Sequence, residues 1–184
     1  MVEIGPKLAG KKQVASDLQA KAVLNVTRLR ILRLCNDREW TNAALAERLG
    51  RDPSTVLHHV RLLVEAGLLA AGQPRQTESG AFEKPYQSTG LSWRLVLDGV
   101  VDVGMGEEPA QLAAFREEFA EAGYEAAVEM IRFQLHLDEA ELNAFLDELQ
   151  TLVERYVQSE PDRAETGRPG YGMFIVAHKM RRED

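Results

Sequence analysis

The sequence predicts a mainly α-helical protein with a small β hairpin, divided into a basic half and an acidic half. Apolar residues recur at helical spacing along most of the chain, and a short apolar strand follows a helix that ends at Gly67. Residues 1–94 carry 14 Lys and Arg against 9 Asp and Glu, a net charge of +5, whereas residues 95–184 carry 8 against 20, a net charge of −12. This asymmetry suggests that the first half meets a polyanion.

Composition limits the class of protein. With 184 residues and 45% hydrophobic content, the chain can bury a core without disulfides or metal ions. Its single cysteine, Cys35, lies in the apolar run 31–35 and is expected to be a buried thiol in a reducing compartment. The N-terminus has no apolar stretch of signal-peptide length, and no run of about 18 uncharged apolar residues occurs. We therefore expect a cytoplasmic protein that does not contact a membrane.

Three regions follow one another along the chain. Residues 1–16 contain lysine and glycine without an apolar period and are expected to form a flexible basic arm. Residues 17–98 are expected to form one domain, which begins with a helix capped by Asp17 and a second helix capped by Thr27. Residues 99–184 are expected to form an acidic helical region.

Two further helices of the first domain meet at a tight turn. One is expected to begin at Thr41 and stop at Gly50, and the next, with Asp52 as its cap, to run from Pro53 to Ala66 and end before Gly67. Aspartate accepts hydrogen bonds from free amide groups at a helix start, and proline at the first helical position loses no hydrogen bond. The sequence therefore predicts two helices separated by only a few residues.

The spacing of Ala46, Gly50 and Val56 indicates how these two helices pack. A small residue lets the helices cross closely, glycine accepts the positive φ angle of the turn, and valine holds the second helix against the first. This spacing is typical of a helix-turn-helix, whose second helix enters the major groove of DNA.

The outer face of the second helix carries the candidate DNA-binding residues. Val56, Val60 and Leu63 are expected to face inward, which leaves a polar surface on the other side. Arginine can contact phosphate or guanine, serine and threonine suit phosphate or base edges, and histidine can donate to a base acceptor. The candidates are Ser54, Thr55, Leu57, His58 and Arg61.

A β hairpin is expected directly after the second helix. It comprises an apolar strand at 68–71, a polar tip at 73–80 and a return strand at about 82–88. Arg75 and Lys84 add positive charge, so the hairpin can lie along the DNA backbone or in the minor groove. Together these elements predict a winged helix-turn-helix. The next residues, 93–97, are compatible with either a strand or a helix start.

Three segments resemble the arsenical-repressor-like (ArsR-type) winged-helix regulators: TRLRIL at 27–32, LAERLG at 45–50 and HHVRLLVEAGL at 58–68. The resemblance covers residues 17–90. It implies a homodimer that binds operator DNA, usually as a repressor, with the helix from Pro53 in the major groove and the hairpin as the wing. The chain departs from the family at Leu57, where a small hydroxyl residue is common, and in the third helix, which lacks the paired cysteines of metal-sensing members.

The acidic region is expected to contain two amphipathic helices. Apolar residues alternate at spacings of three and four over 112–137, and again over 142–156 after a capping box of Asp138 and Glu141. Because such stripes must be buried, the region is predicted to hold a homodimer together. Its aromatic side chains could pack in that interface or line a pocket for a small-molecule effector. Residues 171–177 are expected to form a terminal strand.

Enzymatic and metal-dependent functions lack candidate residues in the sequence. No phosphate-binding loop, nucleophile elbow or dinucleotide fingerprint occurs. His58 and His59 are adjacent and cannot share one helical face, and His136 and His178 lack a partner at ligand spacing. His59 is instead expected to be a half-buried structural residue. We therefore expect no catalytic residues, no cofactor and no metal. The alternative to DNA binding is a winged helix used as a protein-interaction module.

Overall fold

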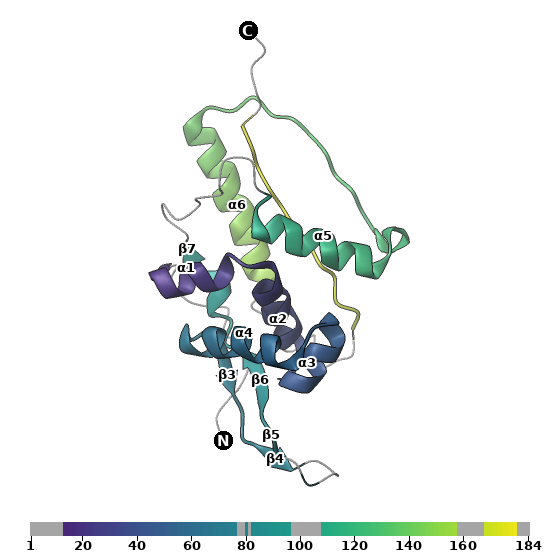
Figure 1. Ribbon diagram of the computed structural model, residues 1–184. Coiled ribbons are helices and arrows are strands. Elements are labelled where there is room, and N and C mark those ends of the chain that lie inside the picture. Colours follow the sequence, from purple (N-terminus) through teal and green to yellow (C-terminus); the bar gives the residue numbers. More distant parts are fainter. Residues whose placement is uncertain (1–12, 77–79, 81, 97–107, 158–167, 180–184) are drawn as a thin grey trace.

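The computed structural model describes residues 13–76, 80, 82–96, 108–157 and 168–179. It confirms a mainly helical fold with a small β wing (Figure 1). The helices are α1 (Asp17–Val23), α2 (Val26–Asp37), α3 (Asn42–Leu49), α4 (Pro53–Glu65), α5 (Ala110–Ala122) and α6 (Glu139–Val157), with 3-10 turns η1 (Leu91–Arg94) and η2 (Tyr124–Ala126). The strands are β1 (Gln13–Val14), β2 (Trp40–Thr41), β3 (Leu69–Ala71), β4 (Arg75–Gln76), β5 (Phe82–Glu83), β6 (Pro85–Ser88) and β7 (Leu95–Val96).

Strands β3 and β6 form the base of the wing. They pair antiparallel, with Leu69 opposite Ser88, and β2 pairs with the other edge of β6. Farther out, β4 pairs antiparallel with β5, and this hairpin projects from the end of the molecule opposite α5 and α6 (Figure 1). The predicted return strand is confirmed, although Lys84 divides it into β5 and β6. Residues 77–79 of the predicted tip, and residue 81 after it, lie outside the described residues.

The caps of the first two helices differ from the prediction. Ser16, not Asp17, caps α1, because its hydroxyl accepts from the backbone N–H of Gln19 while the Gln19 side chain accepts from the Ser16 N–H. Asn25, not Thr27, caps α2 through its side-chain oxygen. In both cases a better-placed polar residue precedes the predicted cap, which becomes part of the helix.

The core of the molecule lies within the first domain. Its largest fully buried side chains come from α2, α3, α4 and the start of the wing: Ile31, Cys35, Leu45, Val56, Val60, Leu63 and Leu68. The prediction of a buried thiol is confirmed at Cys35, which is 0% exposed, and this burial raises its pKa to about 12.

The two ends of this domain meet in a short parallel pair of strands. β1 pairs with β7, with Gln13 opposite Leu95. Residues 13 and 14, which the sequence assigns to the flexible arm, are thus part of a sheet, while residues 1–12 of the predicted arm lie outside the described residues. The choice left open at 93–97 is settled by a 3-10 turn, η1, followed by β7.

The first helix of the acidic region is shorter than predicted. α5 ends at Ala122, and the expected helix over 112–137 is wrong beyond that point. Gly123 has φ 87° and ψ 141°, which breaks the helix, and only the short turn η2 follows before α6. α5 packs on α2, and two alanines, Ala113 and Ala114, are buried there.

The second helix of the acidic region begins as predicted. The backbone N–H of Asp138 donates to Glu141 Oε2 at 2.9 Å and the N–H of Glu141 donates to Asp138 Oδ1 at 2.9 Å, so the capping box is confirmed.

The predicted terminal strand at 171–177 is wrong, because this segment pairs with no strand of the described chain. Among the described residues, no helix is both long and apolar enough to cross a bilayer.

Candidate nucleic-acid interface

The predicted helix-turn-helix is formed by α3, the turn and α4. α3 begins at its cap Thr41 and ends at Gly50, which has φ 60°. A Cβ atom at Gly50 would meet nothing within 4 Å, so the positive φ angle, rather than crowding, is what requires glycine. Ala46 is 3% exposed and Val56 is 0% exposed, and both lie in the domain core. The packing predicted from the spacing of these three residues is confirmed.

Asp52 fixes the start of α4, as predicted. Its Oδ1 accepts from the Ser54 hydroxyl at 2.6 Å and from the backbone N–H groups of Ser54 and Thr55 at 2.8 and 3.3 Å. These hydrogen bonds hold the pKa of the Asp52 carboxyl below its ordinary value. The bond from the Ser54 hydroxyl contributes most to this lowering. Because the Ser54 hydroxyl already donates to Asp52, it suits an acceptor role toward a base amino group better than a contact to phosphate, which needs a donor.

The outer face of α4 presents a continuous polar stripe. Its members are four exposed residues: Ser54, Thr55, His58 and Arg61. At about 100° per residue, the other three lie within about 60° of His58 around the helix axis. Leu57 is half-buried at the edge of this stripe. The opposite side of the helix is anchored in the core by three side chains that are 0% exposed: Val56, Val60 and Leu63. The predicted inward residues are confirmed, as is the exposure of Ser54, Thr55, His58 and Arg61, whereas Leu57, predicted on the exposed face, is half-buried.

Arg51 is a cationic residue of this surface that the sequence analysis did not identify. It is exposed in the turn between α3 and α4, and its backbone N–H donates to the Ala46 carbonyl at 3.0 Å. Its position directly after Gly50 is the signal that could have identified it. An arginine at the entry of a major-groove helix can contact a phosphate.

The wing carries its two predicted cations on exposed positions. Arg75 forms an ion pair with Glu39, while its side chain remains 69% exposed. The partners are 36 residues apart in the sequence, so local spacing does not reveal this pair; the pairing of β2 with β6 and of β4 with β5 places their segments in the same wing. Lys84 is exposed where β5 passes into β6. A phosphate that approaches the wing would compete with Glu39 for Arg75.

His59 lies behind the polar stripe, half-buried as predicted. Its Nδ1 lies 3.4 Å from Nη1 of Arg28, whose other guanidinium nitrogens donate to the carbonyls of Ala22 (2.8 Å) and Lys21 (2.6 Å) at the end of α1. Burial, followed by the nearby charges of Arg28, His58 and Arg51, lowers the pKa of His59. A neutral imidazole can accept from Arg28, so His59 helps to join α1, α2 and α4.

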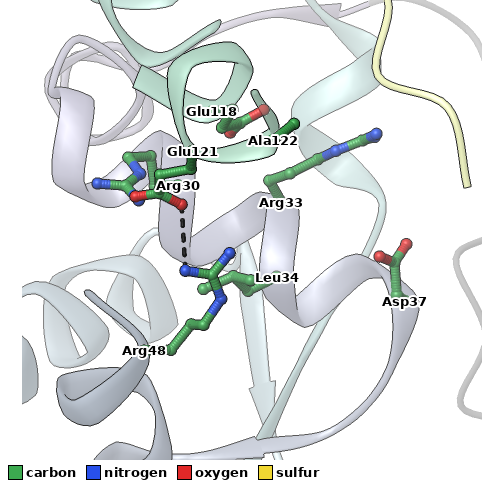
Figure 2. A pocket seen from close by; sticks show the side chains of 8 residues that line it. All are labelled: Arg30, Arg33, Leu34, Asp37, Arg48, Glu118, Glu121 and Ala122. Atoms are coloured by element: carbon green, nitrogen blue, oxygen red, sulfur yellow. Dashed lines mark hydrogen bonds and ion pairs between the residues drawn. The ribbon is translucent and has the colours of Figure 1, made fainter. Parts of the chain in front are cut away.

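Two arginines of the basic half are neutralised by the acidic half. Arg30 of α2 lies 3.0 Å from Glu117 of α5 and also pairs with Glu121, and Arg48 of α3 lies 3.1 Å from the other oxygen of Glu121. Figure 2 shows Arg48 pointing toward Glu121, across the junction between α3 and α5. These ion pairs therefore hold α5 against the first domain and offset part of its positive charge.

A cavity of about 250 Å³ lies beside these ion pairs (Figure 2). Burial raises the pKa of Glu118, one of its acidic side chains. The lining contains three arginines and three acidic residues and no aromatic ring, so it differs from the aromatic effector pocket considered from the sequence. The lining residues are Arg30, Arg33, Leu34, Asp37, Arg48, Glu118, Glu121 and Ala122.

The tail aromatics instead contact one another. The rings of Phe115 and Phe119 stack with centroids 6.1 Å apart, Phe115 also stacks on Phe174 at 5.4 Å, and Phe119 meets Tyr124 edge-on at 5.3 Å.

In the part of the chain that the structure describes, no group of three His, Cys, Asp or Glu side chains is arranged to hold a metal ion.

Comparison with known proteins identifies the central part of this domain. A family model described as a helix-turn-helix domain matches residues 23–70, from the end of α1 to the start of the wing. No curated protein matches the chain. The chain therefore contains a helix-turn-helix domain, and the matched residues include the turn at Gly50 and the polar stripe of α4.

Solved structures of ZitR from Lactococcus lactis are similar to the chain only at low scores. A double mutant of ZitR is 16% identical, with a TM-score of 0.34, over 79% of this chain and 84% of that chain. A single mutant of ZitR in complex with DNA is 22% identical, also with a TM-score of 0.34, over 84% of this chain and 86% of that chain. Likeness at this level adds nothing to the geometry of the helix-turn-helix.

Proposed function

We propose that this chain is a sequence-specific regulator of transcription that binds double-stranded DNA and acts as a homodimeric repressor. The observation that carries the proposal is the polar stripe of α4. Four exposed side chains with hydrogen-bonding groups lie on one side of a helix whose other side is fully anchored in the core. A rigidly held helix with a polar outer face is the element that reads base edges in the major groove.

Cations on both sides of the stripe support contact with the DNA backbone. Arg51 lies at the start of α4, and Arg75 and Lys84 lie on the wing that follows it. Phosphate contacts from such positions set the orientation of the protein on the duplex, while base contacts from α4 would supply specificity. We assign Ser54, Thr55, Leu57, His58 and Arg61 to the groove, and the wing cations to the backbone.

The two halves of the chain have separate tasks in this proposal. Residues 17–98 bind the operator, and residues 99–184 hold two copies together, so that two recognition helices read a palindromic site. The resemblance to ArsR-type regulators supports the homodimer and the repressor role. A small-molecule effector would act through the second half, and the proposed location is the cytoplasm, as expected from the sequence.

Selection from random duplex DNA tests the proposal. The full-length chain is incubated with duplexes of random sequence at physiological salt, and the bound fraction is amplified and sequenced over several rounds. We expect enrichment of a palindrome whose half-sites lie about 10 bp apart or at a multiple of that spacing. Failure to enrich any sequence would contradict specific DNA binding and favour the protein-interaction alternative.

A further inference from the structure

α6 exposes a continuous apolar stripe. The helix has no buried residue, and six large apolar side chains of the stripe are between 37% and 58% exposed: Leu142, Phe145, Leu146, Leu152, Val153 and Tyr156. A seventh, Leu149, is half-buried. At about 100° per residue, the seven positions lie within about 60° of Leu149 around the helix axis. Burial of such a stripe against another surface is favourable, because apolar area leaves water.

The stripe is symmetric about Leu149. Leu142 and Tyr156 lie seven residues from it on either side, Phe145 and Val153 lie four, and Leu146 and Leu152 lie three, as the sequence shows. A second copy of this helix, turned by a two-fold axis that passes Leu149, therefore places an apolar residue opposite every apolar residue. We propose that α6 pairs antiparallel with α6 of a second copy, centred on Leu149. This inference rests on the homodimer of the proposed function and assigns its interface.

The charges beside the stripe favour the antiparallel direction. Glu141 and Arg155 lie along the same edge but are 14 residues apart in the sequence, about 21 Å along one helix, so they cannot pair within a copy. Antiparallel pairing brings Glu141 to within about 3 Å, along the axis, of the level of Arg155 in the second copy. Parallel pairing would instead place each of these charges at the level of its counterpart but on the opposite edge of the interface, so that Glu141 and Arg155 would stay about 21 Å apart along the axis. In the antiparallel pair, Glu148 lies near its counterpart at the two-fold axis. This arrangement therefore has one repulsive contact and two attractive ones.

The side chain of Glu141 is free to make such a contact at one oxygen. Its Oε2 accepts from the Asp138 N–H in the capping box, which leaves Oε1 for a partner. Arg155 lies over the ring of Tyr156, 5.8 Å from its centroid, at the last turn of the helix. Covering of the stripe by another segment of the same chain is the competing arrangement, since Phe133 contacts Phe145 with ring centroids 6.3 Å apart.

Cysteine cross-linking of the full-length chain distinguishes these arrangements. Two variants, Leu142→Cys and Tyr156→Cys, are prepared separately and oxidised alone or as an equal mixture. We expect a disulfide-linked dimer only in the mixture, since antiparallel pairing brings position 142 beside position 156 of the other copy. Thr151→Cys, on the far side of α6, serves as the control and should not cross-link with either variant. Cys35 is 0% exposed and should not react.

Each other cross-linking result overturns the proposal in a specific way. Cross-linking of Leu142→Cys with itself would indicate a parallel pair. Absence of any cross-link in a chain that sediments as a dimer would place the interface elsewhere and leave the proposed homodimer intact. A full-length monomer that still selects a DNA sequence would remove the homodimer together with this inference, but not the DNA-binding role.

A matched pair of substitutions tests the centre of the interface. Leu149→Glu and Thr151→Glu add the same charge to opposite sides of α6. We expect Leu149→Glu to raise the dimer dissociation constant at least about tenfold, because two carboxylates would meet at the axis, and Thr151→Glu to leave it unchanged. Sedimentation measures both values, and circular dichroism shows whether helix content is retained. Equal dimerisation of the two variants would contradict the proposal.

Discussion

The two halves of the molecule differ in how they bury apolar side chains. In residues 13–96, seven large side chains between Ile31 and Leu68 are less than 2% exposed. In the described part of residues 108–179, only Ala113 and Ala114 are buried, whereas large apolar side chains of α6 and of the segments beside it are exposed. The first half thus obtains its core from its own chain. In the second half, α5 packs on α2, but α6 has an apolar face that the described part of the chain does not bury.

The two halves also differ in charge, and part of this difference is used inside the molecule. The sequence shows a basic first half and an acidic second half, which is the pattern expected if only the first meets DNA. However, Arg30 and Arg48 are paired with Glu117 and Glu121. Some of the arginines that make the first half basic therefore form contacts with the second half. The sequence alone does not show which arginines these are.

Removal of the second half is expected to have the largest effect. A fragment that ends at Asp98 keeps the helix-turn-helix and its core but lacks α5 and α6. We expect it to be monomeric and to bind the operator about 100-fold or more weakly than the full chain, because binding of the second half-site is no longer intramolecular. Sedimentation and fluorescence anisotropy measure the two quantities. A fragment that dimerises and binds at full strength would assign the second half another purpose.

Truncation of one leucine in each half should lower the free energy of unfolding by different amounts. Leu45→Ala, at a side chain that is 0% exposed, is expected to lower the free energy of unfolding by about 2–5 kcal/mol. Leu152→Ala, at a side chain that is 45% exposed, should lower it by less than about 1 kcal/mol when measured at a concentration where the chain is monomeric. Urea denaturation provides both values. Equal losses would show that α6 is packed within its own chain.

The wing offers a test of contact to the DNA backbone. Arg75→Ala is expected to weaken binding to all duplexes nearly equally and to reduce the slope of log K against log salt by about one. Glu39→Gln removes the carboxylate that pairs with Arg75 and should strengthen binding to all duplexes. Titrations at several salt concentrations measure both effects. A change of sequence preference in Arg75→Ala would instead show that this residue reads bases.

His59 should give the stability of the first half a small dependence on pH. The pKa of His59 is lower in the folded chain than in the unfolded chain, so the unfolded chain takes up a proton first as the pH falls. The contribution of neutral His59 to stability is therefore present above the ordinary histidine pKa of about 6.5 and is lost as the pH falls from there toward the lowered value. His59→Gln should flatten this part of the profile. The denaturation midpoints of the original chain and of the His59→Gln variant are measured between about pH 5 and pH 8, the range in which histidine titrates.

The sequence predicts the helix-turn-helix well because its signals are local. The cap at Asp52, the glycine at Gly50 and the spacing from Ala46 to Val56 each act within a few residues, and the structure confirms all of them. The polar stripe of α4 follows from the helical period alone. Arg51 could have been found by the same reasoning, since it directly follows the glycine of the turn.

Other features depend on contacts that sequence spacing does not reveal. The pair of Arg75 with Glu39 requires the sheet register, and the ion pairs of Arg30 require the docking of α5 on α2. The apolar period over 112–137 predicts one helix, but Gly123 interrupts it with a positive φ angle. In the second half, therefore, periodicity overestimates the length of the helix, because a helical period does not show whether the stripe has a surface to pack on.

The affinity of α4 variants for duplex DNA tests the central claim most directly. His58→Ala and Arg61→Ala remove exposed side chains of the polar stripe, and Arg116→Ala removes an exposed arginine of α5 as the matched control. We expect each of the first two to weaken binding to the selected duplex by about 1–3 kcal/mol, with folding intact by circular dichroism, and Arg116→Ala to leave it unchanged. Fluorescence anisotropy supplies the three affinities. Unchanged binding by both α4 variants would contradict the assignment of α4 as the recognition helix.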